Sequence, residues 1–321
     1  MSASRTTTRH RTGAQRVLVR TVSNRLGDAV MAIASGAATL VVLAILAVIL
    51  IDILEHGVSH LSITFLTEAP KEGMTAGGIF PAIVGMVEMV VLMTLAGVPV
   101  GVATAVYLHE YAPAEARLTR LIRIAVANLA GVPSIVFGLF GLGFFVQFVG
   151  AGIDKVFFSG EKVYGQPALI WAALTMAVLT LPVVIVATEE ALRAVPRELR
   201  EASLALGATK FQTVAKVVVP QASAGILTGM ILAVSRGAGE VAPILFTGAA
   251  YFLPHLPTGL SSQFMTPSYH VYVLATQSPD VDATKPILYS TVLVLLALTF
   301  ALNITAIVVR ARVRRQNGLA H

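Results

Sequence analysis

Two oppositely charged residues stand four positions apart at the edge of an apolar stretch of the chain. Arg236 and Glu240 follow the charge-free run 217–235 and enclose Gly237 and Gly239. Residues at this spacing lie on one helical face and can form an ion pair. If the stretch crosses a membrane, such charges are costly and mark a functional site by default. The pair therefore predicts either the lining of an anion path or an internal ion pair that positions the helix.

Other polar residues within apolar runs give weaker signals. Glu88 interrupts a long apolar run and could face the protein, reach the membrane surface or be protonated. Asn303 is typical of a hydrogen bond between membrane helices. His255 and His270 lack a second ligand at metal-binding spacing, so we expect no metal site. The phosphate-binding Gly-x-x-x-x-Gly-Lys-Ser/Thr loop and the common hydrolase motifs are absent. We therefore expect no catalytic site and no cofactor in this chain.

A polar segment, 189–220, lies between two apolar runs and carries strong local signals. The Val195-Pro196 step breaks one helix, and a second helix is expected from Arg197 to Leu206. Gly207 is suited to end that helix in a left-handed conformation. A further helix is expected from Lys210 to Val219, before Pro220. The apolar residues on this segment predict docking into a groove on another protein: Leu199, Ala202, Leu206 and Phe211.

The elements that must hold these residues are membrane-spanning helices. The chain is 56% hydrophobic and only 12% charged, whereas soluble domains carry about a quarter charged residues. Roughly 20 apolar residues cross a bilayer, and six runs suffice, at about 29–51, 79–108, 122–149, 167–188, 222–246 and 286–309. Two Gly-x-x-x-Gly pairs, 97/101 and 225/229, predict close helix packing. The charge-free, proline-rich stretch 241–279 predicts an outside loop that lies against the membrane or dips into it, buried by protein.

The basic residues are distributed asymmetrically about these spans. Of the 23 Lys and Arg residues, 18 fall in the segments 1–28, 109–123, 189–216 and 310–321, which alternate topology places on one side. This asymmetry predicts that both termini are cytoplasmic, and it argues against nucleic-acid binding. The first apolar run is longer than a signal-peptide core, so we interpret it as a retained span. The tail before it, through Arg5, Arg9 and Arg11, is expected to be disordered at its start.

The polar segment carries a family resemblance. Glu201-Ala202-Ser203, then Gly207, then Val217-Val218-Val219-Pro220 resemble the Glu-Ala-Ala motif of ATP-binding-cassette (ABC) importer permeases, with Ser for the second Ala and Val for Ile and Leu. The stretches 107–112, 131–139 and 237–248 are similar to phosphate-specific permeases. The run at 242–247 and the segment 268–272 are more similar to the PstA-type subunit than to its PstC-type partner. The resemblance covers roughly 76–310.

This resemblance implies an all-α integral membrane protein with six transmembrane helices and a type I, MetI-like permease core. The implied domains are a basic tail (1–28), a first transmembrane helix with its outside loop (29–75), the ABC transmembrane domain (76–310, with the cytoplasmic coupling loop 189–220) and a second tail (311–321). The residues implied to couple to an ATPase are Arg200, Glu201, Ala202, Ser203, Gly207 and Pro220. Arg236 and Glu240 are implied to line a phosphate path.

The resemblance also implies partners. These are a PstC-type second permease, a PstB-type ATPase dimer that binds ATP and Mg, and an extracytoplasmic PstS-type phosphate-binding protein, all at a bacterial or archaeal inner or plasma membrane. Two alternatives stay open. One is the same machine for another oxyanion or small solute, such as molybdate, sulfate or phosphonate. The other is a passive channel or membrane scaffold, which would need no coupling loop.

Overall fold

The structure, a computed structural model, describes residues 13–113 and 115–316. The predicted disorder around Arg5, Arg9 and Arg11 lies outside the described residues, as do residues 317–321 of the predicted second tail. The chain divides into two compact units, 1–55 and 56–321. Within the described residues, the first unit is formed by helix α1 (Gly13–Gly57), whose last two residues belong to the second unit. All other elements belong to the second unit.

The second unit is helical apart from one small hairpin, in which β1 (Pro70–Lys71) pairs antiparallel with β2 (Ala76–Gly77). Its remaining elements in chain order are η1 (Val58–His60), α2 (Ile63–Thr67), η2 (Glu72–Met74), α3 (Phe80–Val106), η3 (Tyr107–Tyr111), α4 (Arg117–Leu129), α5 (Ser134–Phe140), η4 (Gly141–Gly150), α6 (Ala151–Phe157), α7 (Leu169–Arg193), α8 (Arg197–Ala205), α9 (Lys210–Thr213), η5 (Val214–Val218), α10 (Val219–Gly239), α11 (Ala242–Thr247), α12 (Pro267–Thr276) and α13 (Val281–Gln316).

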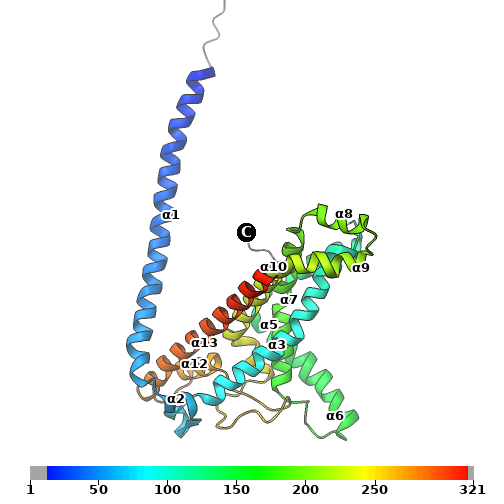
Figure 1. Cartoon of the computed structure of the whole chain (residues 1–321). Helices are drawn as coiled ribbons and strands as arrows, with labels where there is room; N and C mark the ends of the chain where they lie inside the picture. Colours follow the sequence, from blue (N-terminus) through cyan, green and yellow to red (C-terminus); the bar gives the residue numbers. More distant parts are fainter. Residues whose placement is uncertain (1–12, 114, 317–321) are drawn as a thin grey trace, which may run out of the picture. The chain divides into compact units, whose positions relative to one another are not determined.

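Six helical segments among the described residues are long and apolar enough to cross a membrane, as predicted. They are Gly27–His60, Phe80–Tyr111, Ser134–Phe157, Leu169–Arg193, Lys210–Gly239 and Val281–Arg312. The fourth, α7, is the centre of the second unit, since 67% of its most apolar window is buried. Helices α3 and α10 both pack against it. Figure 1 shows α8 and α9 at one end of these helices, which we call the loop end, and α2 and α6 at the other.

Both Gly-x-x-x-Gly pairs face α7, which confirms the predicted close packing. A Cβ atom added at Gly101 of α3 would lie 2.8 Å from Val184 of α7. A Cβ atom added at Gly229 of α10 would lie 2.5 Å from the Cβ of Ala187. Non-bonded carbons normally keep about 3.5–4.0 Å apart. Only glycine therefore allows α3 and α10 to approach α7 this closely.

The predicted start of the third span, near residue 122, was wrong. Residues 117–129 form a separate helix, α4, which carries Arg117, Arg120 and Arg123 on an amphipathic surface. The chain then turns at residues 130–133, where Gly131 N–H donates to Asn128 O at 3.0 Å. Pro133 stands just before α5 with a non-helical ψ of 138°, so the helix begins only at Ser134. The third span begins after this turn and continues to Phe157.

The predicted boundary between the loop and the fifth span was also wrong. We expected a break at Pro220 and a span from about Ala222 to Phe246, but one helix runs from Lys210 to Gly239. A proline in a helix lacks the N–H that bonds to the preceding turn. Residues 214–218 form a π-helical turn in which Val219 N–H donates to Val214 O. This wider turn carries the helix past Pro220.

The stretch 241–279 is folded onto the protein, as the polar backbone of a charge-free loop requires. It contains the short helices α11 and α12, and an isolated bridge joins Ala249 to Phe264. Phe264 and Met265 are fully buried in the core. Residues 248–266 between the two helices are otherwise irregular. The loop therefore packs as part of the core at the end opposite α8 and α9.

Candidate functional site

The helix α8 ends where the sequence predicts. Gly207 has a φ of +85°, in the left-handed region that favours glycine. Ala208 N–H donates to Ser203 O at 3.2 Å, and Gly207 N–H donates to Leu204 O at 3.0 Å. These two bonds satisfy the last free carbonyls of α8 and turn the chain toward α9. Ser203 also hydrogen-bonds Thr213 at 2.9 Å, which ties α8 to the start of the fifth span.

The start of α9 is capped by a motif that our reading of the sequence missed. The Thr209 hydroxyl accepts from Gln212 N–H at 3.3 Å, and the Gln212 side chain accepts from Thr209 N–H at 2.9 Å. A Thr followed three residues later by Gln before a helix is the signal that would have found it. The two caps hold α8 and α9 as a rigid elbow.

The elbow exposes apolar side chains, as predicted. Leu206 is 89% exposed, Phe211 72% and Leu199 39%. Ala202 and Glu201 are exposed beside them. Clustered exposed apolar side chains of this kind mark interaction surfaces. We call these residues, 199, 202, 206 and 211, the elbow surface.

Arg200 faces the opposite way, into the protein. Its guanidinium donates to Glu110 Oε1 at 2.8 Å, to Val195 O at 2.7 Å and to Leu192 O at 2.9 Å. The Arg200 side chain is 17% exposed and that of Glu110 9%. Leu192 lies in the last turn of α7, where carbonyls have no partner within the helix, and Val195 follows that helix. Sequence reasoning placed Arg200 in the loop but missed Glu110, which lies 90 positions away.

Arg236 and Glu240 do meet, at the point where the fifth span ends. Arg236 Nε lies 3.5 Å from Glu240 Oε1, with the two side chains 50% and 19% exposed. Helix α10 stops at Gly239, and Glu240 has an extended backbone with ψ 142°. The Glu240 carbonyl accepts from Ser268 Oγ of α12 at 3.2 Å. The pair is therefore held at a helix break rather than within a continuous helix, with the Arg236 side chain half open.

The residues around this pair are closely packed on one side. Gly237 lies against Met93 of α3, where an added Cβ would stand 2.5 Å from the sulfur. Nothing lies within 4 Å of the same position at Gly239. Ser235 of α10 hydrogen-bonds Asn303 of α13, the interhelical bond expected for Asn303. These contacts position the end of α10, while the Arg236 side chain stays 50% exposed.

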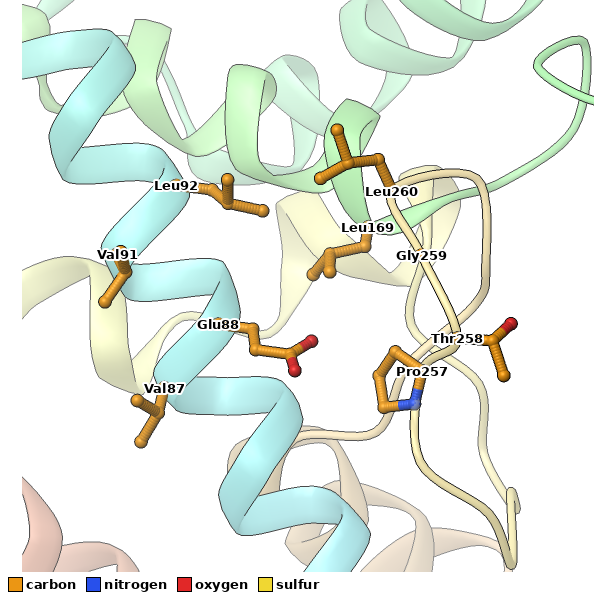
Figure 2. A pocket seen from close by; sticks show the side chains of 9 residues that line it. All are labelled: Val87, Glu88, Val91, Leu92, Leu169, Pro257, Thr258, Gly259 and Leu260. Atoms are coloured by element: carbon orange, nitrogen blue, oxygen red, sulfur yellow. The ribbon is translucent and has the colours of Figure 1, made fainter.

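Glu88 occupies a different place. It lines a hollow of about 450 Å³ together with apolar residues and the loop 257–260. Figure 2 shows its carboxylate extending from α3 toward Pro257 and Leu169. Among the described residues, no hydrogen bond or ion pair joins Glu88 to Arg236 or Glu240. The structure therefore does not bring Glu88 together with the Arg236–Glu240 pair.

Comparisons with known proteins agree with these features. The family profile described as "Binding-protein-dependent transport system inner membrane component" matches residues 97–315. A protein of Bacillus subtilis (strain 168), "Probable ABC transporter permease protein YqgI", is 34% identical over 262 residues, which cover 77% of this chain and 84% of that protein.

Two relatives carry a more specific description. "Phosphate transport system permease protein PstA 1" of Mycobacterium tuberculosis (strain ATCC 25618 / H37Rv) is 40% identical over 53% of this chain and 50% of its own length. "Phosphate transport system permease protein PstA" of Haemophilus influenzae is 34% identical over 68% of each chain. The alignment thus spans only about half of the mycobacterial protein.

Solved structures share the fold at low sequence identity. An inward-facing MetNI methionine ABC transporter gives a TM-score of 0.55 at 19% identity over 73% of this chain and 97% of its own. A bacterial alginate ABC transporter in complex with a pentasaccharide-bound periplasmic protein gives 0.63 at 14% identity over 88% of this chain and 94% of its own. These two structures support the fold and not the substrate.

Proposed function

This chain belongs to the binding-protein-dependent transport system inner membrane component family, and we propose that it is the PstA-type permease subunit of an ATP-driven importer of inorganic phosphate. It is a membrane-embedded, multi-pass permease of the MetI-like fold. The phosphate assignment is supported by PstA relatives at 34–40% identity. The observation on which the phosphate assignment rests is the half-exposed Arg236 side chain at the break after α10.

Arg236 is suited to contact the anion as it passes. A guanidinium presents planar donors that match phosphate oxygens. Its side chain is half exposed and its 3.5 Å contact with Glu240 is long, and an ion pair of this kind adds at most about 1 kcal/mol. A passing phosphate can therefore displace Glu240 at little cost. Glu240 then draws the guanidinium back once the anion leaves, so that binding stays favourable without being tight.

The elbow surface is suited to the ATPase. An exposed apolar elbow at the loop end, on the side that the basic residues assign to the cytoplasm, fits a groove on a soluble subunit. ATP and Mg are bound by that partner, and its closure moves the elbow together with residues Arg200 to Gly207. A PstC-type second permease completes the path, and a PstS-type binding protein delivers phosphate from outside. The chain itself contributes no catalytic residue.

Uptake of labelled phosphate by the reconstituted complex tests this proposal. Arg236→Gln removes the charge and keeps a polar side chain of similar shape, and we expect uptake to fall about tenfold, as loss of a charge-assisted bond of 1.5–3 kcal/mol implies. Arg120→Gln, on the exposed surface of α4, is the matched control. Normal uptake in Arg236→Gln would refute the anion path and leave the family assignment standing.

Two further arms separate the alternatives. Unlabelled molybdate, sulfate or phosphonate that competes with phosphate at equal concentration would favour another oxyanion as substrate. Deletion of 197–210 should abolish uptake while the membrane helices remain folded. Uptake that survives the deletion would indicate a passive channel.

A further inference from the structure

Two arginine side chains join four helical elements at the loop end. The first is Arg200 of α8, which bonds to Glu110 of η3, to Leu192 O in the last turn of α7 and to Val195 O just after it. The second is Arg123 of α4, whose Nη2 donates to Leu108 O at 2.8 Å and whose Nε donates to Glu189 Oε1 of α7 at 3.2 Å. Together they link α8, η3, α7 and α4. We call this set the arginine clamp: Glu110, Arg123, Glu189 and Arg200.

Glu110 is the member through which α8 reaches the second span. Residues 107–111 continue α3 as a π-helical turn, and such turns are frequent at functional sites. Apart from Arg200, the Glu110 carboxylate bonds to its neighbour His109, at 3.0 Å. The side-chain bond from α8 to η3 is thus the Glu110–Arg200 pair, and α9 adds one further contact, with Lys210 Nζ 5.1 Å from the ring centroid of Tyr111.

The clamp shares a hollow with an exposed residue of the elbow. A hollow of about 370 Å³ is lined by Glu110 and Arg200 and also by Glu201, which is exposed on the elbow. The side chains of Leu206 and Phe211 point to solvent from the same elbow. Arg200, which is 17% exposed and bonded to acceptors inside the protein, therefore offers a route from the elbow to the other helices, beside the Ser203–Thr213 bond to the fifth span.

We propose that the arginine clamp makes α8 and the loop ends of α3, α4 and α7 move as one rigid body, with Glu110 as the positioning residue that carries the motion of α8 to α3. The inference rests on the proposed function, since it assigns a route for the ATPase's action within this chain. Without the Glu110–Arg200 pair, α8 still docks and the ATPase still turns over. The movement of α8 is then only partly transmitted to the second span.

The ratio of phosphate imported to ATP hydrolysed tests the clamp in the full complex. We expect Glu110→Gln to assemble and to hydrolyse ATP, while phosphate imported per ATP falls about fivefold or more, the lower end of typical coupling between sites. Arg200→Lys keeps the charge, but an ammonium lacks the planar set of N–H donors with which the guanidinium bonds to Glu110 and two carbonyls at once. It should therefore also lower the amount of phosphate imported per ATP. Glu115→Gln, exposed between η3 and α4, is the matched control and should leave it unchanged.

Two outcomes would overturn the clamp. One is an unchanged ratio in Glu110→Gln. The other is a parallel loss of assembly, ATP hydrolysis and uptake, which would mean that the pair only stabilises the fold.

A second measurement does not depend on phosphate. The chain contains no cysteine, so spin labels placed by Glu198→Cys on α8 and Val100→Cys on α3 report one distance. We expect that distance to be the same with and without ATP in the otherwise unchanged complex, and to shift or broaden with ATP when Glu110→Gln is added. An ATP-dependent shift of equal size in both would refute rigid-body motion. If the unchanged complex imports no phosphate, the proposed substrate fails, and the label distances still decide the clamp.

Discussion

The crossing of α10 over α7 predicts a measurable cost for a single methyl group. In Gly229→Ala the new Cβ would stand 2.5 Å from the Cβ of Ala187. Carbon atoms in contact need about 3.5–4.0 Å, so the two helices must separate by roughly 1 Å. The same helices meet one turn earlier, where a Cβ at Gly225 would stand 2.5 Å from the Cβ of Ala191. Both contacts are between Cβ atoms, which the backbone fixes in place, so no change of side-chain rotamer can relieve the overlap.

The expected magnitude follows from the cost of overfilling a packed interior. Added methyl groups at such sites destabilise by about 1–3 kcal/mol. An alanine in a helix gains up to about 1 kcal/mol over glycine by its helix propensity, which opposes the overlap. Gly239→Ala, at the end of the same helix with nothing within 4 Å of its added Cβ, shares part of that gain without the overlap. The free energy of unfolding of Gly229→Ala should thus lie about 1–3 kcal/mol below that of Gly239→Ala.

Denaturant unfolding of the purified protein in detergent micelles measures this difference. Ala187→Gly removes the opposing methyl group and should recover most of the loss when combined with Gly229→Ala. A coupling of about 0.5–3 kcal/mol between the two substitutions is the expected size for residues in contact. If Gly229→Ala unfolds together with Gly239→Ala, or if Ala187→Gly brings no recovery, the close crossing of α7 and α10 is wrong.

Three further predictions concern the elbow and the outer loop. Leu206→Asp, at a position 89% exposed, should leave the free energy of unfolding unchanged within about 0.5 kcal/mol. It should reduce co-purification of the ATPase about tenfold, since a leucine buried at the interface contributes about 1.5–3 kcal/mol. Val156→Asp, at a position 74% exposed on α6, is the control. Gly207→Val should destabilise the end of α8 by about 1–2 kcal/mol because φ is +85°, whereas Gly207→Asn should cost less than half of that; equal unfolding curves would contradict the left-handed turn. Burial lowers the pKa of His270, which lies in α12 outside the six spans, to about 4. On acidification the unfolded chain therefore binds a proton at this histidine near pH 6.5, before the folded chain does, so the free energy of unfolding should fall between about pH 6.5 and 4 and level off below. His270→Leu should remove this slope when unfolding is measured as a function of pH.

Hydropathy and local turn chemistry predicted the main architecture. Six apolar runs were enough to place six spans, because crossing a bilayer depends on the length of each run alone. Gly207 was predicted as a helix end because few residues other than glycine adopt a positive φ without strain. The exposure of the leucines and the phenylalanine of the elbow was predicted from the amphipathic pattern of this segment, since an amphipathic helix outside the membrane needs a partner to cover its apolar side. All of these signals are contained within a few neighbouring residues.

Helix boundaries were less predictable where proline was involved. Pro133 ends a turn and begins the third span, whereas Pro220 lies inside a continuous helix behind a π-helical turn. Both prolines follow valine in apolar surroundings. The difference lies in whether neighbouring turns can rearrange to satisfy the backbone, which depends on packing against other helices. Local sequence does not contain that information.

The amino-acid sequence determined which segments are apolar enough to cross the membrane, where α8 begins and ends, and that Arg236 and Glu240 lie close enough to pair. Only the tertiary structure decided that both glycine pairs face α7, that Glu88 lies in a separate hollow, and that Arg200 turns inward to Glu110 across 90 positions of the chain. The physical reason is the distance along the chain over which each effect acts. Hydropathy and backbone strain act within one element, whereas the partner of a buried charge or a small residue is chosen by how distant helices pack.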